Sequence, residues 1–235
     1  MRVCRGPVQL RCSIIKNTGL KNQYPIHPNE ESNMRIRQQV KKWVAGFALV
    51  SAAVTAASVV QAAPETYIID TKGAHAFVQF KVKHLGYSWL YGRFNDFSGE
   101  FTYDAANPAA NTVNVVLNMA SLDSAHAERD KHIRSGDFFD VEKFKQATFN
   151  STGYKKVSDA KGVLTGDLTL FGKTKSISLD VDHVGGGADP WGGYRQGFEG
   201  TAVINPADWG KDFSKKLGPA LTEVELTLSV EGIRK

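Results

Sequence analysis

The chain has almost no cysteine, and the part long enough to form a folded domain has none. Both cysteines, Cys4 and Cys12, lie in the first 62 of its 235 residues. Residues 63–235 therefore contain no thiol that could form a disulfide, ligate a metal or act as a nucleophile. The pattern Gly-x-Ser-x-Gly is also missing, which argues against the commonest hydrolase designs.

Runs of basic residues are missing from most of the chain, although its formal net charge is +5. Nine of the Lys and Arg residues stand in the first 62 positions, where only Glu30 and Glu31 oppose them. The remaining 173 residues carry 20 basic and 22 acidic side chains, a net charge of −2. Nucleic acid is therefore not an expected partner, because this part has no Lys/Arg run that could follow phosphates.

The basic N-terminal stretch contains the pattern of a secretory signal peptide. Four cations follow Met34, an apolar and small-residue run extends to Val60, and Val60-Gln61-Ala62 has the spacing of a cleavage site. We expect residues 34–62 to be this leader and the mature protein to be periplasmic. A membrane anchor is the alternative, since the run approaches the ~18–20 residues that span a bilayer. Its many Ala, Ser and Thr residues favour the leader.

Residues 1–33 have mixed polarity and no periodic apolar face. A signal peptide ordinarily begins at its own methionine. We therefore expect Met34 to be the true start and residues 1–33 to be an upstream extension outside the native protein. Residues 63–235 are then the folded domain.

Alternation of apolar and polar residues dominates this domain and predicts β-strands with one apolar face. The apolar members of successive segments are Ala76, Val78, Phe80 and Val82; Val113, Val115, Leu117 and Met119; Leu164, Leu168 and Leu170; Ile177, Leu179 and Val181; Phe198, Ala202 and Ile204; and Val224, Leu226, Leu228 and Val230. Only Ala125–Ser135 has helical character, with Ser124 as the expected N-cap.

Turn residues separate the segments. Gly172-Lys173 predicts a tight hairpin, and the glycine-rich stretch 185–193 predicts a longer loop. Six to nine strands with one continuous apolar face predict a sandwich or a closed barrel. About eight strands leave a lumen that side chains fill or that holds one slender ligand.

Six segments carry a resemblance to one known family and together cover nearly all of 67–233. They are HAFVQFKVKHLGYSWLYGRFNDFSGEF (75–101), HAERDKHIRSGDFF (126–139), QATFNST (146–152), GDLTLFGKTK (166–175), DPWGGYRQGFEG (189–200) and LGPALTEVELTLSVEG (217–232). In these segments the chain resembles the YceI-like proteins, secreted bacterial lipocalin-like barrels associated with polyisoprenoid binding. The resemblance implies an all-β fold, a single eight-stranded antiparallel barrel with one short helix and an internal tunnel for a long isoprenoid chain. It implies no catalytic residue, cofactor or metal.

Aromatic residues are the natural lining of such a tunnel, and residues 63–235 hold 21 of the chain's 24. A sealed core would use the same residue types, and the resemblance favours the tunnel. The expected ligand contacts are Val78, Phe80, Val82, His84, Tyr91, Phe94, Phe97, Met119, Phe138, Phe139, Phe149, Leu168, Trp191 and Phe198. Phe80 and Phe149 are expected to limit the length of the bound chain.

Polar residues leave two interpretations open. His84 falls on the apolar parity of its strand, where it either orients a head group or quinone oxygen or is a buried neutral histidine bonded to a backbone carbonyl. The segment with Glu128, Arg129, Asp130 and His132 is expected to cap the helix and tie it to the barrel by ion pairs. The alternative is an enzyme acting on an isoprenoid lipid, with His84 or the Asp130/His132 pair as acid or base.

The expected function is that of a non-enzymatic binding protein whose partner is an isoprenoid lipid or quinone. Transient contact with a membrane or a membrane protein is compatible with that cargo, and the sequence leaves the oligomeric state open. His75 and Ser151 are further polar candidates near strand ends.

Overall fold

The structure is a computed structural model that describes residues 63–218 and 222–235. The expected signal peptide (34–62) and upstream extension (1–33) lie outside these residues. Among the described helices, none is long and apolar enough to cross a membrane. The elements are β1 (Glu65–Ile69), β2 (Ala76–His84), β3 (Ser88–Phe94), β4 (Phe97–Tyr103), η1 (Pro108–Ala110), β5 (Val113–Asn118), η2 (Met119–Ser121), β6 (Leu122–Asp123), α1 (Ala127–Arg134), β7 (Gln146–Lys156), β8 (Lys161–Leu170), β9 (Lys173–Ala188), β10 (Tyr194–Ile204), η3 (Pro206–Trp209), α2 (Ser214–Leu217) and β11 (Val224–Arg234).

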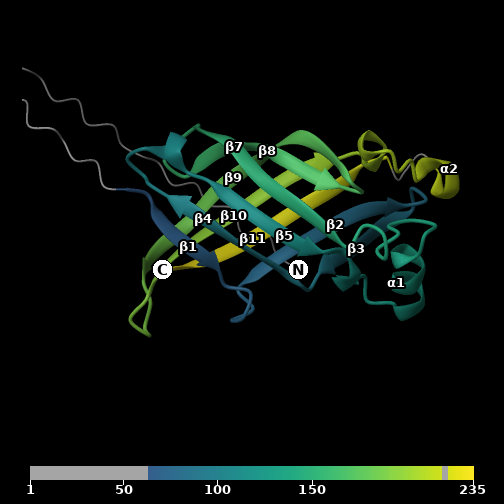
Figure 1. Ribbon diagram of the computed structural model, residues 1–235, viewed down its shortest axis with the longest axis horizontal. Coiled ribbons are helices and arrows are strands. Elements are labelled where there is room, and N and C mark those ends of the chain that lie inside the picture. Colours follow the sequence, from purple (N-terminus) through teal and green to yellow (C-terminus); the bar gives the residue numbers. More distant parts are fainter. Residues whose placement is uncertain (1–62, 219–221) are drawn as a thin grey trace, which may run out of the picture. The chain divides into compact units, whose positions relative to one another are not determined.

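Antiparallel strands close the predicted eight-stranded barrel (Figure 1). Three of its wall strands are interrupted, so that β1 continues as β2, β3 as β4, and β5 as β6. The two halves of an interrupted strand pair with different halves of the next one. Strand β2 pairs with β3, and β1 pairs with β4. Strand β11 closes the ring by pairing with β2 through Val224–Val230 and with β1 through Gly232–Arg234. Strands that follow one another in the chain are therefore neighbours around the whole barrel.

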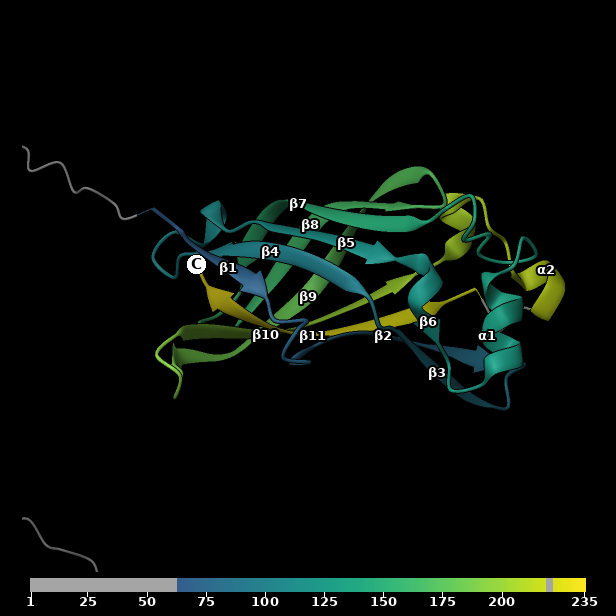
Figure 2. The same ribbon diagram turned by 60° about the horizontal axis from the view of Figure 1, so that its bottom comes forward.

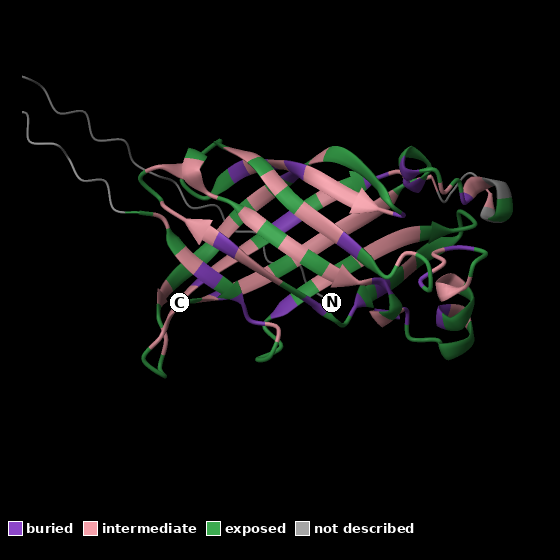
Figure 3. Cartoon of the chain, viewed as in Figure 1, coloured by how far each residue is buried: buried purple, intermediate pink, exposed green. Residues whose placement is uncertain are grey.

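Side chains alternate between the interior and solvent along the wall strands, as Figure 3 shows by the change of burial from residue to residue. In β2, Phe77 and Gln79 are exposed, whereas Val78 and Phe80 pack against the hydrophobic core. The core has two parts. One gathers around Met119, Leu122 and Trp209, and the other gathers around Tyr67 and Phe101. The period-two pattern thus predicted the inner face correctly.

Helices α1 and α2 lie together at one end of the barrel (Figure 2). The prediction of a helix near Ala125–Ser135 is confirmed with shorter bounds, but the predicted N-cap was wrong. His126 caps α1, since its Nδ1 accepts a hydrogen bond of 3.2 Å from the N–H of Arg129. Ala125 has a φ of 62°, so the chain turns between Ser124 and the helix. The short α2 was not predicted.

Two turns decide how the later strands are connected. Phe171 and Gly172, with φ values of 50° and 73°, form the tight β8–β9 hairpin. The hairpin was predicted with Gly172-Lys173 as its turn, but Lys173 already belongs to β9 and pairs with Leu170. The loop predicted over 185–193 is shorter than expected, because β9 continues to Ala188 and its glycines pair with β10. A Cβ on Gly186 would fall 2.1 Å from Oε1 of Gln196. Glycine is therefore needed there to admit a neighbouring side chain.

Candidate ligand-binding site

The barrel encloses a cavity of about 520 Å³. Its wall consists mainly of aliphatic and aromatic side chains from all eight wall strands. This volume lies within the range of ~300–1,000 Å³ that is usual for small-molecule sites. Since an apolar cavity of ~150 Å³ holds one benzene molecule, this cavity has room for on the order of 20 carbon atoms.

Most of the residues predicted as ligand contacts line this cavity. Eleven do so: Val78, Phe80, Val82, His84, Phe94, Met119, Phe138, Phe139, Phe149, Leu168 and Phe198. They come together because their strands place them on the inward parity, or because the segment after α1 folds across the end of the barrel. Their contact with a ligand stays a prediction.

Three predicted residues lie elsewhere. Tyr91 is 65% exposed, because it stands three positions from the inward Phe94 and hence on the opposite face of the strand. Trp191 is 77% exposed in the turn between β9 and β10, where the guanidinium carbon of Arg195 lies 5.3 Å from the centre of its ring. Phe97 is buried, but it packs in the Tyr67 cluster and does not reach the cavity.

Several cavity rings cover a glycine on the neighbouring strand, among them those of Phe80 and Phe149. A Cβ on Gly92 would fall 2.3 Å from Cζ of Phe80, and a Cβ on Gly166 would fall 2.3 Å from Cζ of Phe149. Each ring occupies the space that a side chain in place of the glycine would need. The glycines therefore let the rings lie against the wall, which leaves space along the barrel interior.

Polar and charged side chains lie at the cavity end next to α1. His84, Arg129 and His132 line it there. Among the described residues the His84 imidazole has no hydrogen-bond or ion-pair partner, and His84 is classed as exposed. The prediction of a buried histidine bonded to a backbone carbonyl is therefore wrong. His84 therefore sits at the rim of the cavity.

The α1 residues have a structural role, but hydrogen bonds to Ser124 supply it. The ion pairs to the barrel that were predicted for Glu128, Arg129, Asp130 and His132 are not found among the described residues. Asp130 is buried and accepts hydrogen bonds from the backbone N–H of Ser124, at 2.9 Å, and from its hydroxyl. Arg129 donates to the same hydroxyl at 2.7 Å. His132 instead lies 3.6 Å from Asp137. Asp130 and His132 therefore do not form an acid–base pair.

The opposite end of the cavity holds a polar group that the sequence analysis missed. His183 lines it, and its Nε2 lies 2.7 Å from Oε1 of the buried Gln196. The ring centres of Tyr103 and Phe198 lie 5.3 and 5.0 Å from that of His183. Tyr154 lines the same end, and burial raises the pKa of its hydroxyl. His183 continues the inward alternation of Ile177, Leu179 and Val181, so the pattern could have revealed it.

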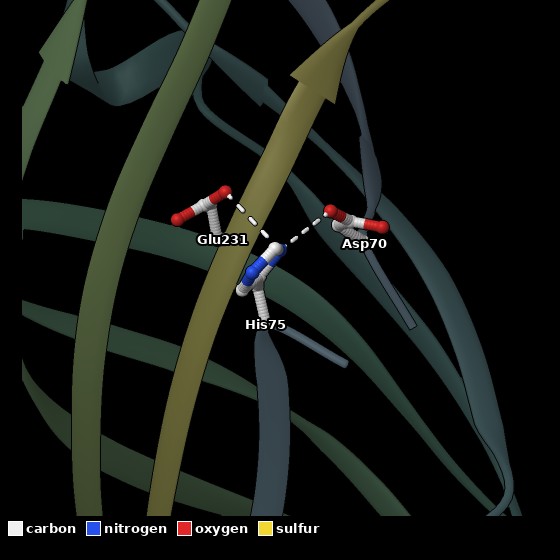
Figure 4. A group of neighbouring side chains, drawn as sticks. All are labelled: Asp70, His75 and Glu231. Carbon is white, nitrogen blue, oxygen red and sulfur yellow. Dashed lines mark hydrogen bonds and ion pairs between the residues drawn. The ribbon is translucent and has the colours of Figure 1, made fainter. Parts of the chain in front are cut away.

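A second polar cluster lies where β1 is interrupted, and Figure 4 shows three of its members. Arg195 donates from Nη1 to Asp70 at 2.8 Å and to Glu231, and from Nε to Asp189 at 2.8 Å. His75 Nδ1 lies 3.0 Å from the same Asp70 oxygen. Hydrogen bonds from His75 and Arg195 lower the pKa of the buried Asp70 carboxyl to about 2. The cluster joins the β1–β2 link to β10 and β11.

This cluster has the composition of a metal site, because Asp70, His75 and Glu231 place ligand atoms within 4.8 Å of one another. However, Arg195 already donates to oxygens of both carboxylates. A metal ion would compete with a guanidinium that cannot lose its charge. We therefore interpret the cluster as an ion-pair network that stabilises the interrupted strand.

Neither of the other polar candidates contributes a free group to the cavity. His75 binds Asp70, as described above. The Ser151 hydroxyl accepts a 2.7 Å hydrogen bond from the N–H of Val113, beside an irregularity in the pairing of β7 with β8. Both side chains therefore stabilise strand ends.

A closed barrel with an apolar interior and polar ends defines a class of proteins that enclose a hydrophobic ligand. Comparison with known sequences gives the family. Residues 67–232 match the YceI-like domain, and the chain belongs to that family. It is 54% identical over 196 residues to a UPF0312 protein of Pseudomonas aeruginosa strain LESB58, which covers 83% of this chain and 100% of the relative. A UPF0312 protein of Yersinia pestis is 52% identical over 195 residues, covering 83% of this chain and 98% of the relative.

Solved structures show the same fold. The YCEI protein of Campylobacter jejuni is 30% identical, with a TM-score of 0.60 over 66% of this chain and 91% of that one. Burkholderia cenocepacia BcnA is 24% identical, with a TM-score of 0.62 over 69% of this chain and 98% of that one. A domain from Saccharophagus degradans, described as polyisoprenoid-binding, is 16% identical, with a TM-score of 0.51 over 72% of this chain and 98% of that one.

Proposed function

We propose that this protein is an exported, non-enzymatic binding protein that holds a long isoprenoid chain, either a polyprenyl lipid or the tail of an isoprenoid quinone. The observation that carries the proposal is the 520 Å³ cavity, with its apolar wall and a polar group at each end. A chain with an apolar body and one polar end matches that distribution. The description of the Saccharophagus degradans domain as polyisoprenoid-binding supports the same ligand class.

The energetics are adequate for such a ligand. Each buried CH₂-sized group contributes about 0.8 kcal/mol. Three or four isoprene units therefore offset an association cost of several kcal/mol. A barrel whose interior is filled by its own side chains would bind nothing, and the observed cavity argues against that alternative.

Native mass spectrometry of the exported protein, followed by lipid extraction, tests the binding. We expect a bound isoprenoid, or uptake of a prenyl alcohol or isoprenoid quinone when the purified protein is incubated with it. Protein that is empty and also fails to take up isoprenoids would contradict the proposal.

Export is a separate part of the proposal, since it depends on the leader expected at 34–62. N-terminal sequencing or the intact mass of the exported protein tests it. We expect the mature chain to begin at Ala63 in the periplasm. A mature chain that retains Cys4 or Cys12 would contradict both the leader and the start at Met34.

A further inference from the structure

Exposed apolar side chains concentrate on one ribbon of the barrel, formed by β2 and β3. Eleven large apolar residues are exposed in the described part of the chain, and five of them belong to this ribbon: Phe77, Leu85, Tyr87, Trp89 and Tyr91. Tyr87 is 87% exposed and Leu85 50%. A cluster of this kind marks an interaction surface, whereas scattered single residues do not.

The tip of the ribbon carries a leucine where the backbone favours another residue. Leu85 and Gly86 have φ values of 51° and 83°, and the N–H of Tyr87 donates to the carbonyl of His84 at 2.9 Å. This is a type I′ turn, whose first central position favours Asn, Asp or Gly. A leucine there is strained and half exposed, so the stability of the hairpin does not account for it.

The charge of the ribbon has a single sign. Residues 76–94 contain Lys81, Lys83 and Arg93 and no Asp or Glu. The amines of Lys81 and Lys83 lie 4.5 and 5.4 Å from the centre of the Trp89 ring. Acids of neighbouring strands pair with two of these cations, since Lys81 lies 2.8 Å from Glu225 of β11 and Arg93 lies 3.3 Å from Asp123 of β6. Trp and Tyr beside lysines are typical of surfaces that lie at the boundary between lipid head groups and acyl chains.

The ribbon is continuous with the cavity. Lys83, His84, Leu85 and Leu90 line the same space as Phe80 and Phe149. The exposed tip and the polar rim of the cavity are therefore parts of one end of the barrel, on the side of α1 (Figure 2).

We propose that the β2–β3 ribbon docks the barrel onto an anionic lipid bilayer, with Leu85, Tyr87 and Trp89 entering the interface. Lys83 and Lys81 face the anionic head groups, and the adjoining end of the cavity faces the membrane. Docking itself rests on the exposed residues, the turn and the charge. Its use for exchanging an isoprenoid with the membrane rests on the proposed function.

Co-sedimentation with vesicles of phosphatidylethanolamine and phosphatidylglycerol tests the docking. We expect the wild-type protein to bind, and Leu85→Asn to lower its vesicle partition coefficient about tenfold, because half of a leucine side chain no longer enters the lipid. Asparagine suits the turn, so this variant keeps or raises the melting temperature. Val157→Ser, which removes an apolar residue that is 65% exposed in the β7–β8 hairpin, is the matched control and should bind as the wild type does.

Two outcomes would overturn the proposal. One is absence of binding by the wild-type protein, and the other is equal binding by wild type and Leu85→Asn. If the wild-type protein does not bind vesicles but transfers isoprenoid to a protein acceptor, the docking proposal also fails, and the partner is a protein. Uptake of detergent-dispersed isoprenoid by the wild-type protein without vesicles distinguishes this failure from failure of the proposed function, because loading from detergent does not require docking.

Discussion

The ring of Phe80 on β2 covers Gly92 on β3, its partner across the ladder, so closely that a Cβ at position 92 would fall 2.3 Å from the ring. The Phe149 ring likewise covers Gly166 on β8, although Gly166 pairs with Ser151 and thus lies diagonally across the ladder from Phe149. These glycines therefore act on the width of the cavity, because they decide where the rings can lie.

Substituting Gly92 by alanine should narrow the cavity. The added methyl group displaces the Phe80 ring from the wall, and overpacking of this kind costs about 1–3 kcal/mol. We expect lower stability in urea and a preference for shorter or fewer isoprene units in competitive uptake. The double variant Gly92→Ala/Phe80→Ala should lose less stability than the sum of the two single variants, because the two residues are in contact. Additive effects in the double variant would show that the ring and the glycine are independent.

Removing the rings should have an effect that depends on lipid. Phe→Ala in a sealed core costs ~3–5 kcal/mol. For Phe80→Ala and Phe149→Ala we expect a smaller loss with lipid bound, since the ligand occupies part of the vacated space, and acceptance of longer or bulkier chains. Thermal unfolding with and without isoprenoids of graded length measures both. Phe97→Ala, buried away from the cavity, is the control and should lose the same stability in either condition. If Phe80→Ala and Phe149→Ala also lose the same stability with and without lipid, and the preferred chain length does not shift, these rings are ordinary core residues.

Variants of the two histidines at the cavity end next to α1, His84 and His132, distinguish a binding protein from an enzyme. We expect His84→Ala and His132→Ala to retain lipid occupancy, and no turnover of bound isoprenoid by the wild type or either variant. Incubation with an isoprenoid followed by mass spectrometry of the extract measures this. Turnover that is lost in His84→Ala but kept in His132→Ala would instead favour an enzyme with His84 as acid or base.

The Asp70 network should make stability depend on pH at the acidic end. Because pairing with His75 and Arg195 lowers the Asp70 pKa to about 2, its contribution is present above the ordinary pKa of ~3.9 and is lost as pH falls through the folded-state value. We expect Asp70→Asn to destabilise the barrel by about 1–2 kcal/mol at neutral pH and by much less near pH 2. Asp182→Asn, which breaks an exposed pair with Lys161, should change stability by less than about 1 kcal/mol. A loss for Asp70→Asn that is the same at both pH values would contradict the assignment.

The inward face of the barrel could be predicted from the sequence because alternation is a local property. Val78, Phe80 and Val82 stand two apart, so any extended conformation places them on the same side. The same rule applied strictly would have placed Tyr91 outside, since it stands three residues from Phe94, and would have added His183 to the lining.

What the sequence by itself determined is therefore the class of fold, the strands and most of the side chains that face the interior. Only the tertiary structure decided which interior residues border empty space, since Phe97 and Phe80 share a pattern but only Phe80 has a glycine opposite its ring. The structure alone also brought Arg195 to Asp70, 125 residues away. The physical reason is that periodicity depends on neighbouring positions, whereas cavity space and ion pairs depend on closure of the barrel, which brings distant strands together.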